Sequence, residues 1–222
     1  MSKNTIVFGA HGKVGQRLIG VLAKNKASAT AVVRNDSQAQ TISKIAGGSD
    51  SIKTTNLDLA QTSVKELVSK LQGHDSVVLA VGSAGKDLLK VDLDGVVKTF
   101  EAAVEAKIRR LILVSALFAE SHEFFEKSSL RDYYIAKHYA DRILINEFGS
   151  KLDYTILKPS LLGDGDGTGK VQFLQPGQEG KVIDRQDVAQ SIYKILDLKS
   201  TFGKSYNYTA GDQSIDSDST WN

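Results

Sequence analysis

The sequence contains no cysteine, and this absence removes three kinds of site at once. None of the 222 residues can form a disulfide, supply a thiolate nucleophile or bind zinc through sulfur. The chain therefore carries no redox-compartment signature, and we expect no metal site.

The chain also lacks long apolar runs and an excess of either charge. No run of about 18 apolar residues occurs, which excludes a membrane span. The opening "MSKNTIVFGAHG" has neither the basic start nor the long apolar stretch of a secretory signal. Lys+Arg 28 against Asp+Glu 26 gives a net charge of +2, with no basic stripe for nucleic acid. We therefore expect a cytoplasmic protein whose partners include neither a membrane nor a nucleic acid.

Short β-branched runs alternate with amphipathic helical patterns along most of the chain. Near-continuous apolar strands separated by helices indicate a parallel sheet covered on both faces. Right-handed crossovers then give a doubly wound α/β fold of Rossmann type. The strands are expected at 4–10, 29–34, 51–59, 76–83, 109–116 and 153–160.

The composition changes after Pro159, one of only two prolines. A glycine-rich segment, "GDGDGTGKVQFLQPGQEGKV", is followed by a helix from about Asp187 and a last strand, "SYNYTA". These pieces are too small for an independent domain, so residues 1–222 are expected to form a single domain with a small C-terminal cap. The polar, acidic end at 211–222 is expected to be a loose tail.

The segment "VFGAHGKVG" gives the strongest functional signal. Its glycines lie between an apolar strand and an amphipathic helix, which is the context of a dinucleotide-binding fingerprint. Glycine allows a tight turn and close backbone approach, and a helix N-terminus offers free N–H groups to a pyrophosphate. The alternative is a plain strand-to-helix turn. The expected cofactor-binding residues are Gly9, Ala10, His11, Gly12, Lys13, Val14 and Gly15.

The residue after the second strand distinguishes between the two nicotinamide cofactors. An NAD site carries an acid there to hold the ribose hydroxyls, whereas an arginine suits the 2′-phosphate of NADP. In "AVVRND" that residue is Arg34, and Asp36 follows two positions later. A planar guanidinium can bind phosphate through two hydrogen bonds and stack on adenine. The sequence therefore favours NADP (NADPH), the alternative being a solvated arginine.

Two further strand ends give weaker signals. The third strand ends in "NLDLA", where the carboxylate of Asp58 could accept the adenine amino group beside Leu59. The fourth ends in "LAVGS", whose glycine lets the backbone approach the ribose and pyrophosphate. Ligands of open α/β sheets bind at the carboxyl ends of strands, so both segments are expected in the cofactor site. The residues of the second segment are Ala80, Val81, Gly82 and Ser83.

Taken in order, several segments resemble one superfamily. The glycine spacing, Arg34, "NLDLA", "AVGSAG", "VDLDG", "LILVSA", Tyr133-x-x-x-Lys137 and "LDYTILKPSLL" resemble the short-chain dehydrogenase/reductases. The similarity is strongest to atypical single-domain members, described as NAD(P)-binding oxidoreductases, sugar epimerases or flavin reductases. It extends from about residue 4 to about residue 212. The motifs are specific to the superfamily and not to one reaction.

The resemblance implies roles for three catalytic residues. In that superfamily a tyrosine is the general acid/base, a lysine lowers its pKa and holds the nicotinamide ribose, and a serine orients the substrate carbonyl. Tyr133, Lys137 and Ser115 take these places. At helical spacing Tyr133 and Lys137 share a face with alanines and Leu144, where a lysine is poorly placed for solvation. The alternative is a lysine that snorkels from the edge of a core stripe.

Two departures and one match complete the resemblance. Asp92 in "VDLDG" replaces the usual asparagine, as the atypical group tends to have. Ser115 is the only hydroxyl at its strand end because Ala116 and Leu117 follow, whereas many relatives have two or three. Pro159 matches the strand-end proline that packs near the nicotinamide and belongs to the expected cofactor site.

Together these features predict an NADPH-dependent oxidoreductase. Hydride would pass between the nicotinamide and a small carbonyl, alcohol or flavin-like acceptor, with Tyr133 supplying the proton. One alternative is a nucleotide-sugar epimerase, disfavoured because only about sixty residues follow Pro159. Another is a non-catalytic NADP redox sensor, although such sensors commonly lack the Tyr-x-x-x-Lys pair. The expected partner is a small-molecule substrate, and the expected state is a monomer or homodimer.

Overall fold

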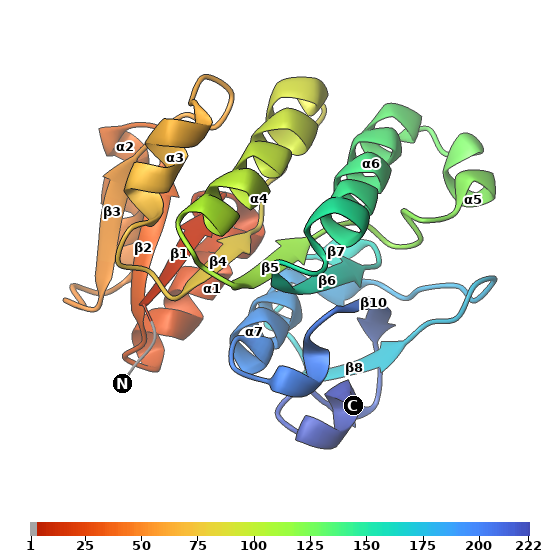
Figure 1. Cartoon of the computed structure of the whole chain (residues 1–222). Helices are drawn as coiled ribbons and strands as arrows, with labels where there is room; N and C mark the ends of the chain where they lie inside the picture. The colour runs from red at the N-terminus through yellow and green to blue at the C-terminus, as the bar shows by residue number, and fades with distance from the viewer. Residues whose placement is uncertain (1–3) are drawn as a thin grey trace.

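The computed structural model describes residues 4–222 and contains a mostly parallel sheet between two layers of helices (Figure 1). In this part of the chain the sheet has nine strands in the order β11-β8-β10-β6-β5-β4-β1-β2-β3. From β10 to β3 all neighbours are parallel, while β8 pairs antiparallel with β10 and β11. The strands are β1 (Asn4–Phe8), β2 (Ser28–Val33), β3 (Ile52–Asn56), β4 (Ser76–Leu79), β5 (Arg110–Val114), β6 (Asp153–Pro159), β8 (Lys170–Phe173), β10 (Lys204–Ala210) and β11 (Gln213–Ser214). A separate parallel pair joins β7 (Leu162–Gly163) to β9 (Ile183–Asp184).

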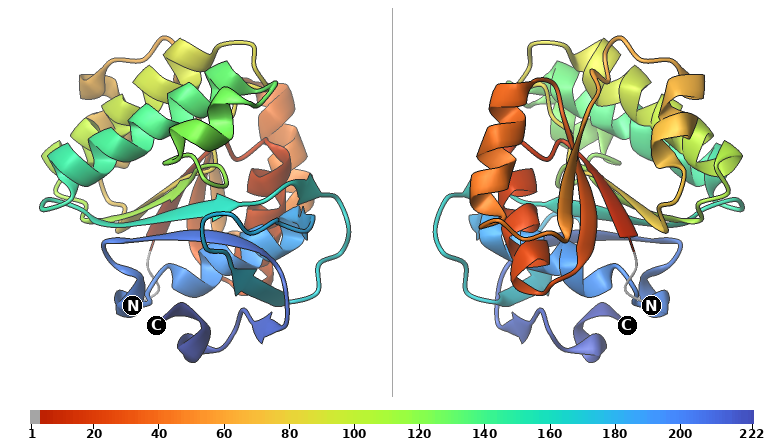
Figure 2. Two further views of the ribbon diagram at one scale, coloured as in Figure 1. Left: turned by 90° about the vertical axis from the view of Figure 1, so that its right-hand side faces the viewer. Right: turned by 90° about the vertical axis from the view of Figure 1, so that its left-hand side faces the viewer.

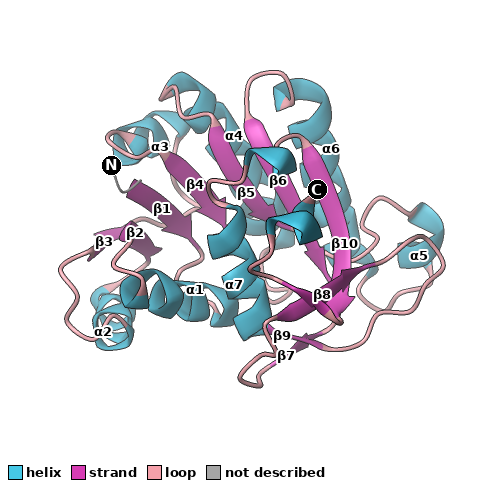
Figure 3. Cartoon of the chain, turned by 90° about the horizontal axis from the view of Figure 1, so that it is seen from below, coloured by secondary structure: helices cyan, strands magenta, loops and turns pink. Residues whose placement is uncertain are grey.

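Two helical layers cover the sheet, which explains why its inner strands are apolar on both sides. One layer holds α1 (Lys13–Lys24), α2 (Asp36–Ile45) and α7 (Arg185–Ile195), on the face seen in Figure 3. The other holds α3 (Val64–Leu71), α4 (Val96–Glu105) and α6 (Arg131–Phe148). In β5 the side chain of Ile112 packs in the first layer and that of Leu111 in the second, as the alternation of a strand requires. The predicted doubly wound α/β fold is confirmed.

Strand order reverses at β1, which pairs with β2 on one side and with β4 on the other. The chain moves from β1 to β2 and β3, and then returns across the sheet to β4. Such a switch point leaves a crevice outside the carboxyl ends of the strands, where ligands of these sheets bind. The glycine loop at residues 9–12 starts from this point.

Several strands are shorter than the sequence predicted. The third strand ends at Asn56 and the fourth at Leu79, so residues 57–59 and 80–83 are loops beyond the strand ends. A π-helix, Leu88–Gly95, precedes α4, and a short α5 (His122–Glu126) precedes α6. The helix expected from about Asp187 begins at Arg185. The antiparallel β8 and β11 were not expected.

The C-terminal segment packs against the domain, so the prediction of a loose tail at 211–222 is wrong. Trp221 is fully buried, and its Nε1 donates to the carbonyl oxygen of Ile215 at 2.9 Å. The Tyr206 hydroxyl donates to the carbonyl oxygen of Trp221, also at 2.9 Å. Lys194 of α7 pairs with Asp218 at 2.6 Å. Burial of Trp221 therefore holds this segment against the domain, although most of its residues are polar. Within residues 4–222, no helix has the length and apolar character needed to cross a bilayer.

Candidate active site

The three glycines of the fingerprint have different roles: Gly9 and Gly12 lie in the loop between β1 and α1, and Gly15 lies in the first turn of α1. Gly9 has φ +75°, and a Cβ there would overlap the carbonyl oxygen of Ala80 at the end of β4. A Cβ at Gly15 would overlap the carbonyl oxygen of Gly9. Gly12 is exposed and has φ −64°, and the nearest atom to its Cβ would be the Gly9 oxygen at 3.1 Å. Gly9 and Gly15 are therefore required by the fold, whereas Gly12 leaves space on the outer side of the loop.

Within residues 4–222, the N-terminus of α1 has no side-chain cap. Its N-cap, Gly12, makes no side-chain cap, and the first turn contains no acid. By contrast, Asn35 caps α2 and Ser63 caps α3 through their side chains. The first-turn N–H groups of α1 can therefore bind an anion, as the dinucleotide fingerprint requires. His11 and Lys13 flank this loop, and Ala10 and Val14 are buried beneath it.

Arg34 follows β2, the strand next to β1. Its backbone N–H donates to Gln38 Oε1 at 2.9 Å, while Asn35 accepts from the Gln38 N–H and caps α2. Within the described chain, the exposed guanidinium has neither a hydrogen bond nor an ion pair. It is thus available to a phosphate beside the glycine loop.

The two predicted residues after β3 point in different directions. Asp58 is exposed, and its Oδ1 accepts the backbone N–H of Ala60 at 3.1 Å. Leu59 is buried in the core, where its side chain packs against Gly95. Only the backbone of Leu59 can therefore contact a cofactor.

Lys137 of α6 lies at the end of β4. It is buried, and its Nζ donates to the carbonyl oxygen of Val81 at 2.9 Å and lies 3.6 Å from Asp92 Oδ1. Asp92 Oδ2 in turn accepts the backbone N–H of Ser83 at 2.9 Å. The π-helix supplies Asp92, in keeping with the frequent use of widened helical turns at functional sites. The structure thus brings Lys137 together with the segment from Ala80 to Ser83.

The lysine does not activate the tyrosine in the way that the sequence suggested. Burial raises the pKa of the Tyr133 phenol above its ordinary value, and the negative charge of Asp92 adds to this. Burial lowers the pKa of Lys137, although Asp92 and Asp141 oppose that effect. Because the ammonium pairs with Asp92, it does little to favour a phenolate. The protein's own groups therefore shift the pKa of the Tyr133 phenol upward, opposite to the direction that the resemblance implies, and the phenol is protonated at neutral pH.

Tyr133 lines a cavity of about 770 Å³, here called the Tyr133 cavity. Its lining residues come from the ends of β5 and β6, the segment from β5 to α6, the start of α6 and the loop after β8. Figures 1 and 2 show α5 beside α6 in this part of the molecule. Ser115 and Pro159 also line it, so three predicted residues face the same cavity. Most of its other lining is apolar, with Leu117, Phe118, Phe124, Leu130, Tyr134, Leu161, Leu162 and Pro176. Its polar lining residues are Glu120, Ser121, Ser160, Gln178, Glu179 and Arg185. The cavity therefore suits a ligand with an apolar body and a few polar groups.

Ser115 belongs to a buried polar group that the sequence did not predict. Its Oγ donates to Asp141 Oδ2 at 2.9 Å, and Lys158 Nζ lies 3.2 Å from the same oxygen. Lys158 also pairs with Glu120 at 2.7 Å, and Asn207 donates to Glu120 at 2.6 Å. Asp141 could have been suspected from its i, i+4, i+8 spacing with Tyr133 and Lys137 on one helix. Lys158 offered no such signal, since it lies in β6 and has no sequence spacing to these helix residues.

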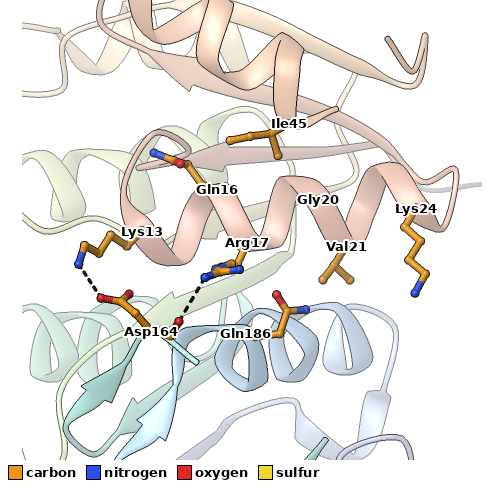
Figure 4. Close-up of a pocket in the computed structure, with 9 residues that line it drawn as sticks. All are labelled: Lys13, Gln16, Arg17, Gly20, Val21, Lys24, Ile45, Asp164 and Gln186. Atoms are coloured by element: carbon orange, nitrogen blue, oxygen red, sulfur yellow. Dashed lines mark hydrogen bonds and ion pairs between the residues drawn. The ribbon is translucent and has the colours of Figure 1, made fainter. Parts of the chain in front are cut away.

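A second groove of about 500 Å³ follows the outer side of α1, near the glycine loop (Figure 4). Lys13 points toward Asp164 from the loop after β7, and their atoms are 2.7 Å apart. Arg17 donates to the carbonyl oxygen of Asp164 at 3.4 Å, and Arg185 pairs with its carboxylate at 2.7 Å. Lys13, a predicted cofactor ligand, is thus held by an acid in this structure.

Replacing Asp164 with asparagine should strengthen NADPH binding slightly. The change frees Lys13 for the cofactor phosphates, but exposed ion pairs are weak, so we expect a gain of no more than about threefold. Calorimetric titration with NADPH would measure it, with Asp166→Asn in the same loop as the control. A weakening of NADPH binding would mean that Asp164 itself supports the cofactor site.

Comparison with known proteins agrees with this geometry. The sequence matches the family described as NAD(P)H-binding over residues 9–199. It is 37% identical over 214 residues to a protein of Bacillus subtilis (strain 168) described as the uncharacterized sugar epimerase YhfK, covering 94% of this chain and 95% of that protein. It is also 37% identical over 221 residues to the UPF0659 protein YMR090W of Saccharomyces cerevisiae, covering 95% and 94% respectively.

Among solved structures, the oxidoreductase ylbE from Lactococcus lactis is similar throughout. The TM-score is 0.85 at 31% identity, and the match covers 96% of this chain and 93% of that one. The relatives are thus described as epimerases in some cases and oxidoreductases in others.

Proposed function

The chain belongs to the NAD(P)H-binding family, among the atypical short-chain dehydrogenases/reductases, and we propose that it is an NADPH-dependent reductase. The observation that supports this proposal best is the position of Tyr133, a neutral proton donor in the wall of an apolar cavity, with Lys137 one turn further along α6. The glycine loop at the switch point gives the proposal its cofactor site.

The residues present fit a dinucleotide. The uncapped N-terminus of α1 and the space outside Gly12 suit the pyrophosphate, and the unpaired guanidinium of Arg34 suits a 2′-phosphate. Lys137 and the segment from Ala80 to Ser83 would hold the nicotinamide ribose. Bound NADPH would supply the hydride.

Tyr133 would donate a proton to the oxygen of the reduced carbonyl. Its raised pKa keeps the phenol protonated at neutral pH, which suits reduction better than alcohol oxidation. The apolar lining of the cavity would exclude water and bind an apolar carbonyl compound or a flavin-like ring. A flavin-like acceptor needs no protein proton donor, so the two substrate classes differ in their dependence on Tyr133.

A sugar epimerase is the second candidate, favoured by the description of the B. subtilis relative. Such an enzyme would retain its cofactor through the reaction, whereas a reductase must exchange it at every turnover. Most of the lining of the Tyr133 cavity is apolar, which favours an acceptor with an apolar body over a sugar, and polar lining residues such as Glu120, Gln178 and Arg185 would bind the few polar groups of that acceptor. Mixing the protein with NADPH and a panel of ketones, quinones and flavins tests the proposal, because only a reductase consumes NADPH in proportion to the acceptor.

Arg34→Ala should narrow the preference for NADPH over NADH. Loss of a charge-assisted hydrogen bond to the 2′-phosphate costs about 1.5–3 kcal/mol, and NADH, which lacks that phosphate, should bind as before. Calorimetry on both cofactors measures the gap, with the exposed Lys44→Ala in α2 as the control. Equal affinities of the unmodified protein for NADPH and NADH would mean that Arg34 faces solvent only.

A further inference from the structure

Four polar side chains form a continuous series of contacts that begins and ends in the wall of the Tyr133 cavity. Ser115 Oγ donates to Asp141 Oδ2 at 2.9 Å, and Lys158 Nζ lies 3.2 Å from that oxygen. Lys158 Nζ then donates to Glu120 Oε2 at 2.7 Å. Ser115 and Glu120 both line the cavity, whereas Asp141 and Lys158 lie behind its wall. The series joins residues of α6 and β6 to the segment after β5.

The stability of the fold does not account for this arrangement. The side chains of Asp141 and Lys158 are only 4% and 3% exposed, and a buried ion pair often stabilises no better than apolar residues of the same volume. Burial raises the pKa of Asp141, with Lys158 and the Ser115 hydroxyl opposing the shift. Asp141 Oδ1 has no hydrogen-bond partner within residues 4–222. Asp141 and Glu120 raise the pKa of Lys158 despite its burial, so the net shift disfavours the charge of Asp141 and not that of the lysine. The contact of Asp141 that reaches the cavity is the one with Ser115.

The contact with Asp141 determines what Ser115 can offer to a ligand. A serine hydroxyl has one proton to donate and two lone pairs that accept. Ser115 gives its proton to a carboxylate, which cannot return one while it is ionised. Only the lone pairs of Ser115 remain for the cavity. A carbonyl oxygen, which itself needs a donor, gains nothing from them.

We propose that Asp141 is a positioning residue that makes Ser115 a hydrogen-bond acceptor, so that the substrate carries an O–H or N–H group in addition to its reacting carbonyl. The inference rests on the proposed reductase function and names its substrate class. Tyr133 donates to the carbonyl oxygen, and Ser115 accepts from the O–H or N–H group in the same cavity. The substrate is thus a hydroxy- or amino-substituted carbonyl compound with an apolar body. This differs from the role implied by resemblance, in which the serine orients the carbonyl itself.

Positive groups from two elements favour the ionised form of Asp141 that this role requires, and they oppose the effect of burial. Lys158 of β6 contacts its carboxylate directly, and Lys137, one turn away on α6, adds a second positive charge. Asp92 and Glu120 partly neutralise these two lysines. Replacing Asp141 by alanine removes the acceptor of the serine proton. The Ser115 hydroxyl of that variant can then donate its proton into the cavity. Asparagine would not serve, because its amide oxygen would stay beside the Lys158 ammonium and still accept from Ser115.

Binding of two unreactive probes to the NADPH-bound protein tests the proposal. Phenol and anisole have similar size, but only phenol has a proton to donate. Quenching of NADPH fluorescence reports each affinity, and the ratio of the two measures the preference for a donor. We expect the unmodified protein to favour phenol by roughly 2- to 12-fold, the range of one neutral hydrogen bond. Because the readout is a ratio, a general loosening of the cavity leaves it unchanged.

Three variants show where the preference arises. Ser115→Ala should bring the ratio close to one, and Asp141→Ala should lower it because the serine can then also donate to anisole. Glu147→Gln, an exposed acid on the same helix, should keep the ratio. If Asp141→Ala does not fold, Ser115→Ala still tests whether the serine is the acceptor. Equal affinities in the unmodified protein, including no binding of either probe, would overturn the proposal, as would a preference that survives in Ser115→Ala. Failure of NADPH to bind at all, seen before any probe is added, would count against the proposed function instead.

Discussion

Tyr133→Phe should lower kcat for a carbonyl substrate by roughly 10²–10⁴, with NADPH affinity nearly unchanged. The variant keeps the ring, which lies 5.6 Å from Lys137 Nζ, and removes only the proton donor. In the unmodified enzyme the pKa of the phenol is raised by burial and by Asp92, so the proton is present throughout the neutral range. Because the phenol does not lose its proton between about pH 6 and about pH 9, its titration should not change kcat for reduction in that range. Steady-state kinetics across that range measures both effects.

The exposed Tyr139 on the same helix provides the matched control. Tyr139→Phe should leave kcat unchanged, because this ring lies outside the Tyr133 cavity. If the natural acceptor is a flavin-like ring, Tyr133→Phe should be nearly silent with it and still harmful with ketones. Equal turnover of ketones by the parent and the Tyr133 variant would leave this tyrosine with a packing role only.

The second large effect is expected at the glycine loop, where Gly12→Val should abolish NADPH binding while the protein stays folded. The backbone of Gly12 has φ −64°, which any residue can adopt, and its Cβ would have to move the Gly9 carbonyl by only a few tenths of an ångström. The added methyl groups would occupy the space where the pyrophosphate must approach. Calorimetry with NADPH and a thermal melt of the same sample separate binding from folding.

Variants of two other glycines in α1 serve as controls for this test, one for folding and one for binding. Gly15→Val should fail to fold, since a Cβ there would overlap the Gly9 carbonyl oxygen. Gly20→Ala, two turns along α1, should bind NADPH normally, because the nearest atom to its Cβ, a methyl carbon of Ile45, is 3.8 Å away. Retained NADPH affinity in Gly12→Val would remove the glycine loop from the cofactor site.

The fold could be predicted from the sequence because its signals are local. Apolar strands such as "RRLILVSA" are apolar on both faces, since helices cover both, and the glycine loop marks the switch point by itself. The prediction that failed concerned a segment whose packing depends on contacts between residues far apart in the sequence. The tail at 211–222 looks loose by composition, but Trp221 binds to Tyr206 and Ile215 in the folded chain.

The residues of the candidate site also differ in whether local sequence signals could predict them. Tyr133 and Lys137 were found because one helix presents both, and the resemblance supplied their roles. Their electrostatics could not be predicted, because Asp92, which neutralises Lys137, comes from a π-helix with no sequence signature. The contact of Ser115 with Asp141 likewise depends on how α6 packs against the end of β5, which the sequence does not specify.

The central claim is that this protein passes hydride from NADPH to an acceptor in the Tyr133 cavity. The most direct measurement uses NADPH deuterated at the transferred position, mixed with the protein and an aromatic α-hydroxy ketone. We predict that the near-ultraviolet absorbance of NADPH falls, that the deuterium appears on the carbinol carbon of the product, and that Leu161→Trp, which narrows the cavity, slows the transfer. Bound NADPH that is never oxidised by this ketone, by quinones or by flavins would contradict the claim and leave a cofactor-binding protein without turnover.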